Sequence, residues 1–174
     1  DMPLQVANGN FDLAITGRDW LTEHRYQFPS SPARELLDLK YGRVRIVAVV
    51  SNDVPADDIE GLRRLRQKSR ETYRVASEYI NIADDYSWNN HLGRCRIIPT
   101  WGATETFLPE DADLLIENTE TGGTIARHNL KIIDTLFEST ACLIGATETV
   151  LSPLKKRRIE FIKKAIGKAV EASE

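Results

Sequence analysis

The 174-residue sequence predicts an α/β fold of two lobes, with mainly parallel sheets and a middle lobe inserted into the outer one. Three observations support this prediction. Short apolar runs alternate with amphipathic segments along the chain. Residues 44–50 are continuously apolar and rich in β-branched side chains, which is typical of a strand buried on both faces. Polar crossings near residues 50–55 and 117–123 divide the chain into an outer lobe, 1–50 with 123–174, and an inserted lobe, 51–122.

Apolar runs bounded by glycine, proline or polar residues predict the strands. The run 11–16 is followed directly by Gly17 and a polar cluster, a layout typical of the ligand edge of an α/β sheet. In chain order, the expected strands cover residues 11–16, 44–50, 73–76, 96–99, 113–116 and 141–144.

Apolar residues at three- and four-residue spacing predict the helices. Pro3 suits the first turn of a helix at the start of the chain. Ile125, Leu130 and Ile133 share one face if the segment after the fifth strand is helical. In chain order, the expected helices cover residues 1–9, 57–70, 81–91, a short turn within 102–108, 124–137 and 153–172. Residues 18–32 are expected to form a polar cluster and a loop. Residues 33–39 are expected to form a short amphipathic segment.

The composition narrows the possible functions. Lys and Arg total 23 and Asp and Glu total 26, a net charge of −3, which argues against a dedicated nucleic-acid binder. The sequence contains no secretory signal and no apolar run long enough to span a membrane. Cys95 and Cys142 are the only cysteines and show no metal-ligand spacing, so no metal-binding side chains are predicted and a cytoplasmic location is expected.

The segment after the fifth strand carries the predicted chemistry, with the sequence E-N-T-E-T-G-G-T at 117–124. Gly122 and Gly123 allow backbone N–H groups to face a ligand without a Cβ in the way. The start of the following helix adds unpaired N–H donors for an anion. Thr121 and Thr124 add hydroxyl donors, so this loop is predicted to bind a phosphate group.

Two acids accompany this loop. Glu117 and Glu120 can accept hydrogen bonds from ribose hydroxyls or hold Mg²⁺ beside a pyrophosphate. Carboxylates for a sugar and a threonine-glycine loop for its phosphate together favour a 5-phosphoribosyl ligand. The alternative is an ordinary strand-to-helix turn in which Thr124 caps the helix.

The same segment resembles the phosphoribosyl-diphosphate site of the ATP phosphoribosyltransferase family, in which an acid and two apolar residues precede E-T-G-x-T and a helix. Further resemblance follows in the family's order, in NGNFDLAITGRDWL at 8–21, LLDLKYGRVRIVAVV at 36–50, YRVASEY at 73–79, GATET at 102–106 and LKIIDTLFESTACLIGA at 130–146. The resemblance covers nearly the whole chain up to residue 146.

The chain departs from the family pattern at several points. Glu117 stands where the family has Asp, and HNL at 128–130 replaces NGL. The family's amino-terminal strand with its basic loop and its carboxyl-terminal regulatory domain have no counterpart. A truncated catalytic region is therefore expected, and the activity of this fragment is left open.

The resemblance implies a glycosyltransferase that joins N1 of the adenine of ATP to C1′ of phosphoribosyl diphosphate and releases pyrophosphate, the first step of histidine biosynthesis. It also implies Mg²⁺ as a cofactor, held mostly by substrate oxygens and water. The implied partners are ATP and phosphoribosyl diphosphate, with a homo-oligomer or a regulatory subunit. No nucleic acid and no membrane are expected as partners.

The resemblance also assigns residues. Arg18 is expected to pair with pyrophosphate or with the phosphates of ATP, and Asp12 to orient Arg18. Glu105 is expected to face the nucleotide, whereas Trp101 is either a packing residue or a stacking surface for adenine. The expected catalytic residues are Glu117, Glu120 and Arg18, and the expected substrate-binding residues are Thr121, Gly122, Gly123, Thr124, Asp12, Thr16, Gly17 and Glu105.

Two other functions fit the same sequence. Two α/β lobes with paired crossings are the arrangement of type II periplasmic-binding proteins, so the chain could be a non-catalytic solute-binding module. It could also be an inactive homologue that serves as a partner subunit. Binding of phosphoribosyl diphosphate with Mg²⁺ separates the first of these from the enzyme.

Overall fold

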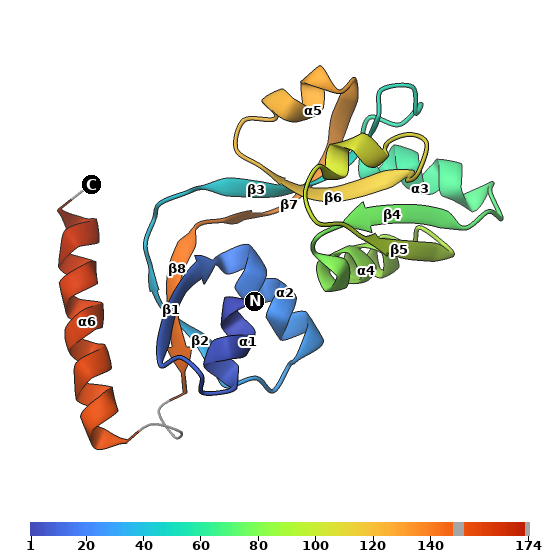
Figure 1. The fold of residues 1–174 in the computed structure, drawn as a ribbon. Coiled ribbons are helices and arrows are strands. Elements are labelled where there is room, and N and C mark those ends of the chain that lie inside the picture. Colours follow the sequence, from blue (N-terminus) through green and yellow to red (C-terminus); the bar gives the residue numbers. More distant parts are fainter. Residues whose placement is uncertain (148–151, 173–174) are drawn as a thin grey trace. The chain divides into compact units, whose positions relative to one another are not determined.

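The computed structural model describes residues 1–147 and 152–172. The chain divides into two compact units: Asp1–Arg43 with Ser139–Glu174, which we call the outer unit, and Val44–Glu138, the middle unit (Figure 1). The boundaries expected from the sequence, at 50/51 and 122/123, differ from these. The difference arises because residues 44–51 and 130–139, which the prediction placed mostly in the outer lobe, form strands of the sheet in the middle unit.

The outer unit is built on a three-stranded sheet in the order β1-β8-β2. Its two outer strands both run antiparallel to the central strand. A small core joins the sheet to the first two helices through Val6, Leu21, Ala33, Cys142 and Ile144. The elements are α1 (Met2–Ala7), β1 (Leu13–Gly17), α2 (Arg18–Gln27), β2 (Ala33–Asp38), β8 (Ala141–Ala146) and α6 (Pro153–Glu171).

The middle unit is built on a five-stranded sheet in the order β5-β4-β6-β3-β7. Strand β4 is parallel to β5 and β6, whereas β3 and β6 are antiparallel. The elements are β3 (Val44–Ser51), α3 (Ile59–Gln67), β4 (Tyr73–Ser77), α4 (Ile80–Asn89), β5 (Cys95–Pro99), the 3₁₀ turn η1 (Thr104–Phe107), β6 (Leu114–Thr119), α5 (Gly123–Arg127) and β7 (Leu130–Ser139).

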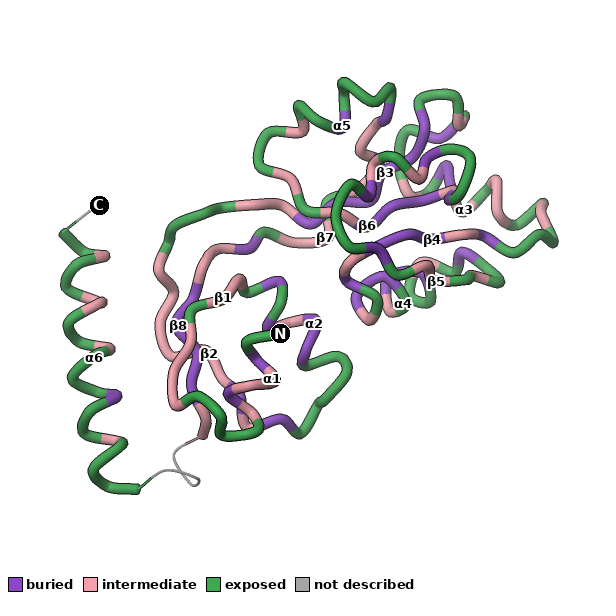
Figure 2. Tube along the Cα trace, viewed as in Figure 1, coloured by how far each residue is buried: buried purple, intermediate pink, exposed green. Residues whose placement is uncertain are grey.

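Strand β3 is buried on both faces, as the sequence predicted. Ile46, Ala48 and Val50 enter one hydrophobic cluster, while Val47 and Val49 enter another, because successive side chains point to opposite faces. Figure 2 shows buried residues concentrated along β3, β4 and β6, whereas α6 is mainly exposed. These buried strands carry the loops that follow their ends.

Two parts of the predicted fold are wrong. The sheets are mixed rather than mainly parallel, since both pairings in the outer sheet are antiparallel and the middle sheet contains the antiparallel pair β3–β6. The helix expected over 124–137 ends at Arg127. Asn129 adopts a left-handed conformation (φ 57°) that stops the helix, and the β-branched run that follows forms strand β7.

The remaining predicted elements are present with small shifts of their ends. Helix α2 formed within the predicted polar cluster and loop, and strand β2 formed at the predicted amphipathic segment.

None of the helices within residues 1–147 and 152–172 combines the length and apolar character that a membrane crossing requires.

Candidate functional site

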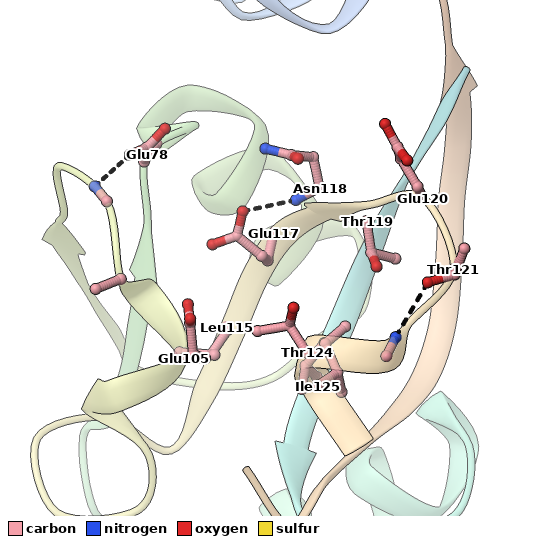
Figure 3. Close-up of a pocket in the computed structure, with 14 residues that line it drawn as sticks. Glu78, Glu105, Leu115, Glu117, Asn118, Thr119, Glu120, Thr121, Thr124 and Ile125 are labelled. Carbon is pink, nitrogen blue, oxygen red and sulfur yellow. Dashed lines mark hydrogen bonds between the residues drawn. The ribbon is translucent and has the colours of Figure 1, made fainter. Parts of the chain in front are cut away.

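A pocket of about 490 Å³ lies in the middle unit, at the carboxyl ends of β4 and β6. These ends meet at one edge because the two strands are parallel neighbours. Figure 3 shows the side chains that surround it. The lining residues are Val49, Glu78, Gly102, Ala103, Glu105, Leu115, Glu117, Asn118, Thr119, Glu120, Thr121, Gly123, Thr124 and Ile125.

The carboxylate of Glu117 lies between Glu78 and Thr121 in the lining of this pocket (Figure 3). Its Oε1 atom accepts a hydrogen bond of 2.9 Å from the backbone N–H of Asn118. Burial raises the pKa of Glu117, and the nearby negative charges of Glu78 and Glu105 raise it further, while hydrogen bonds from Thr104 and Asn118 oppose the change. The pocket therefore holds a carboxylate that accepts a proton more readily than an exposed glutamate does.

Glu78 fixes the loop on one side of the pocket. It directly follows β4, and its carboxylate accepts a hydrogen bond from the backbone N–H of Gly102 (Figure 3). Gly102 and Ala103 both have positive φ angles, 86° and 51°, so the chain turns sharply before η1. This turn lets Glu105 reach the lining of the same pocket.

The loop between β6 and α5 forms the other side. Gly122 has a φ of 79°, and its N–H donates to Thr119 Oγ1 at 2.9 Å. The N–H of Gly123 donates to Thr121 Oγ1 at 3.4 Å. Glycine is favoured at this left-handed position because it has no Cβ. These bonds bend the loop so that the first turn of α5 faces the pocket.

This side of the pocket offers hydrogen-bond donors. Thr124 Oγ1 accepts from the Arg127 guanidinium at 3.2 Å, and Thr121 Oγ1 also acts as an acceptor within the loop, so both hydroxyl protons can be donated to a ligand. The backbone N–H groups of Thr124 and Ile125 have no acceptor in the part of the chain that the structure describes. Such a set of donors suits an anion.

The charges of the lining are all negative. Four carboxylates line the pocket, those of Glu78, Glu105, Glu117 and Glu120, and no lysine or arginine is among the lining residues. Across residues 1–147 and 152–172, no three His, Cys, Asp or Glu side chains are grouped as a metal site. The carboxylates therefore suit hydroxyl groups and a cation that a ligand brings with it.

The structure brings together most of the predicted site residues. Glu105, Glu117, Glu120, Thr121, Gly123 and Thr124 line one pocket. Gly122 lies in the same loop and is the N-cap of α5. The other four predicted residues, Asp12, Thr16, Gly17 and Arg18, belong to the outer unit.

The expected orientation of Arg18 by Asp12 is wrong. Arg18 Nε lies 2.8 Å from Glu35 Oε2, and its Nη1 lies 3.2 Å from Asp38 Oδ2. Asp12 instead pairs with Lys155 Nζ at 2.7 Å. The pairing follows from the sheet, because β2 presents Glu35 and Asp38 beside β8, whose partner β1 ends directly before Arg18.

Sequence reasoning missed Glu78, Gly102, Ala103 and Thr119 as parts of this site. A signal for Glu78 was present, since it lies two residues after the strand predicted at 73–76, and Glu117 directly follows the strand predicted at 113–116. Residues after neighbouring parallel strands share one sheet edge. The order of the strands was the information that the sequence did not supply.

Comparisons with known proteins agree with the resemblance. The family model described as HisG, ATP phosphoribosyltransferase, matches residues 1–168. The chain is 32% identical over 177 residues to the ATP phosphoribosyltransferase of Chlorobaculum parvum and 32% identical over 174 residues to that of Solibacter usitatus. Each alignment covers 99% of this chain but only 55% and 56% of the relative, so the chain spans little more than half the length of these relatives.

Solved structures share the fold. The ATP phosphoribosyl transferase (HisG:HisZ) complex from Thermotoga maritima superposes with a TM-score of 0.78 at 21% identity, covering 99% of this chain and 76% of that chain. A periplasmic transporter gives a TM-score of 0.64 at 11% identity, covering 92% of this chain and 62% of that chain. At these identities the likeness concerns the fold alone.

Proposed function

This chain belongs to the ATP phosphoribosyltransferase family, and from that premise we propose that it is the catalytic region of an enzyme that transfers a phosphoribosyl group to ATP. The reaction forms a bond between N1 of adenine and C1′ of phosphoribosyl diphosphate. The C1′–oxygen bond breaks, and its electron pair leaves with pyrophosphate. The observation that carries the proposal is one pocket with anion donors on one side and carboxylates beside them.

We assign the loop from Thr121 to Thr124 to the 5-phosphate. The first-turn N–H groups of α5 and the two threonine hydroxyls supply donors without a fixed positive charge. Gly122 and Gly123 keep the backbone of this loop free of Cβ atoms. Binding through backbone N–H groups and hydroxyls positions the sugar without neutralising it fully.

We assign Glu117 and Glu120 to the ribose hydroxyls. Ionised carboxylates accept hydrogen bonds from hydroxyl groups and attract positive charge. As pyrophosphate departs, C1′ and the ring oxygen develop positive charge in an oxocarbenium-like transition state. Carboxylates that line the pocket stabilise that charge.

Mg²⁺ is the proposed cofactor. The donor set fits a cation shared with the substrate, because oxygen ligands from glutamate line the pocket and no complete protein cage lies within the described ranges. Glu117 or Glu120 would supply a carboxylate oxygen, with the remaining ligands coming from substrate and water. When bound, Mg²⁺ neutralises charge on the pyrophosphate group.

Residues of the outer unit are proposed for the remaining phosphates. Arg18 presents a guanidinium whose side chain is 43% exposed, and guanidinium groups bind phosphate with two parallel hydrogen bonds. Thr16 and Gly17 directly precede it on β1. In this proposal Glu35 and Asp38, rather than Asp12, orient Arg18.

We further propose the two-lobe, type II periplasmic-binding-protein-like arrangement, with the middle unit inserted in the outer one. Fold likeness to a periplasmic transporter and to the glutamate-binding core of GluR0 supports it.

A homo-oligomer or a regulatory subunit is the proposed partner, since the Thermotoga maritima relative was solved as a HisG:HisZ complex. We propose a cytoplasmic enzyme. The family match argues against a solute-binding module or an inactive subunit.

The test is release of pyrophosphate from ATP and phosphoribosyl diphosphate in the presence of Mg²⁺. We expect Thr121→Ala combined with Thr124→Ala to weaken phosphoribosyl-diphosphate binding by at least about tenfold, because two hydrogen bonds to a charged group are lost. Thr121→Ser combined with Thr124→Ser keeps both hydroxyls and serves as the control. Binding of an amino acid, with no binding of phosphoribosyl diphosphate, would contradict the proposal.

A further inference from the structure

The middle unit carries two tryptophans that are almost fully exposed. Trp88 on α4 is 81% exposed and Trp101 is 89% exposed. Trp101 directly precedes Gly102 and Ala103, which line the pocket, whereas Trp88 does not border any lining residue in sequence. Trp101 is therefore an exposed aromatic residue that adjoins the pocket lining along the chain.

We propose that Trp101 is the stacking surface for the purine ring of the nucleotide substrate, an inference that rests on the proposed function. Two features support this assignment: the fixed loop that carries Trp101 and the direction of the pocket. Both determine where a base would lie.

The loop around Trp101 is fixed on both sides. The N–H of Thr100 donates to the carbonyl of Ser77 at 3.1 Å, and the hydroxyls of Thr100 and Thr104 lie 2.9 Å apart in a buried hydrogen bond. On the other side, Gly102 donates its N–H to Glu78. Because its neighbours are held, Trp101 can bind a planar ring with little loss of backbone freedom.

The pocket has a direction that places a base near this loop. Thr121 and Glu78 lie on opposite sides of Glu117 (Figure 3). A ribose whose 5-phosphate contacts the Thr121 side, and whose hydroxyls contact Glu117, directs C1′ away from the phosphate loop. The incoming nitrogen must approach C1′, so its ring system lies on the side of Glu78 and Gly102.

The chemistry of the indole fits a purine. Purines present two flat faces that stack on aromatic side chains, and the stacked surfaces are removed from water. Single apolar residues on a protein surface are common, so exposure alone would not assign a function to Trp101. The fixed loop and the direction of the pocket distinguish Trp101 from Trp88.

Isothermal titration calorimetry of the 174-residue chain tests the assignment. ATP, base-free tripolyphosphate, and phosphoribosyl diphosphate with Mg²⁺ are titrated separately into the wild type, Trp101→Ala, Trp101→Phe and the matched control Trp88→Ala. We expect Trp101→Ala to weaken ATP binding at least about fivefold, the lower end for loss of one stacked base. Trp101→Phe should restore most of the affinity, and Trp88→Ala should match the wild type.

The two other ligands identify the cause. Trp101→Ala should bind tripolyphosphate and phosphoribosyl diphosphate as the wild type does, because neither carries a base. Equal ATP affinity in the wild type and Trp101→Ala overturns the stacking role, and if phosphoribosyl diphosphate still binds, the proposed function stands. A wild-type chain that binds neither ATP nor phosphoribosyl diphosphate contradicts both.

Discussion

The carboxylate of Glu78 accepts a hydrogen bond from the backbone N–H of Gly102, and so joins the end of β4 to the loop that follows β5. The same carboxylate contributes negative charge to the surroundings of Glu117. One side chain thus has two separable effects, one on the loop and one on the electrostatics of the pocket.

These two effects predict different results for two variants of Glu78. Glu78→Gln keeps an acceptor for Gly102 but removes the charge, so the pKa of Glu117 should fall toward its ordinary value while the loop keeps its position. Glu78→Ala removes both. Carboxyl carbon NMR titration of Glu117 measures the pKa, and amide exchange at Gly102 measures the loop. An unchanged pKa of Glu117 in both variants would rule out the electrostatic coupling.

The raised pKa of Glu117 predicts a pH dependence of ligand binding. Only the ionised carboxylate accepts hydrogen bonds from ribose hydroxyls at both oxygens, so affinity for phosphoribosyl diphosphate should fall as pH decreases through the pKa of Glu117. That loss begins at a higher pH than an ordinary glutamate, with a pKa near 4.3, would give. Glu105→Gln should move the loss to lower pH, because Glu105 also raises the pKa of Glu117. Calorimetric titrations at several pH values measure the shift.

Asn129 predicts a difference between two substitutions at the turn from α5 to β7. Its φ is 57°, and its Oδ1 accepts a hydrogen bond of 2.9 Å from Asn52 Nδ2. Asn129→Ala combines left-handed strain with loss of this bond and should cost about 2 kcal/mol, whereas Asn129→Gly should cost less because glycine adopts the conformation without strain. Urea unfolding compares the two free energies. Equal losses would show that the backbone conformation contributes nothing.

His24 predicts acid sensitivity of the outer unit. The side chain is 2% exposed, its Nε2 lies 2.7 Å from Ser31 Oγ, and burial lowers its pKa. The ordinary pKa near 6.5 applies to the unfolded chain. Because the folded pKa is the lower one, the stabilising contribution is fully present above pH 6.5 and is lost as pH falls through the folded value. His24→Asn should flatten the decline in urea-unfolding free energy below pH 6.5.

Gly17 predicts a steric requirement that is independent of any ligand. A Cβ at this position would lie 2.0 Å from Asp19 Oδ1, and Asp19 is buried and bonded to Ser139 Oγ at 2.6 Å. Gly17→Ala should therefore displace a buried hydrogen bond and cost about 2 kcal/mol of unfolding free energy. Gly123→Ala is the matched control, since its Cβ would meet Thr121 Oγ1 at 3.5 Å. Urea unfolding measures the free energies of both variants, and equal values would contradict this role of Gly17.

The sequence predicted the features that depend on short segments. The apolar run of β3, the positions of most strands along the chain, and the donors and acids of the loop at 117–124 all follow from residues adjacent in the chain. Such features are visible because side-chain periodicity and glycine conformation act locally. Local spacing does not predict pairing between strands. The apolar spacing over 124–137 suited a helix, whereas pairing in the middle sheet favoured a strand over residues 130–139.

By itself, then, the sequence determined the hydrogen-bonding groups of the loop at 117–124 and the family of the chain. Only the tertiary structure decided that Glu78 and Gly102 complete the pocket, and that Arg18 pairs with Glu35 and Asp38 instead of Asp12. The physical reason is that strand order and register bring distant residues to one sheet edge. Those pairings depend on hydrogen bonds and packing between whole strands, which no local pattern of residues specifies.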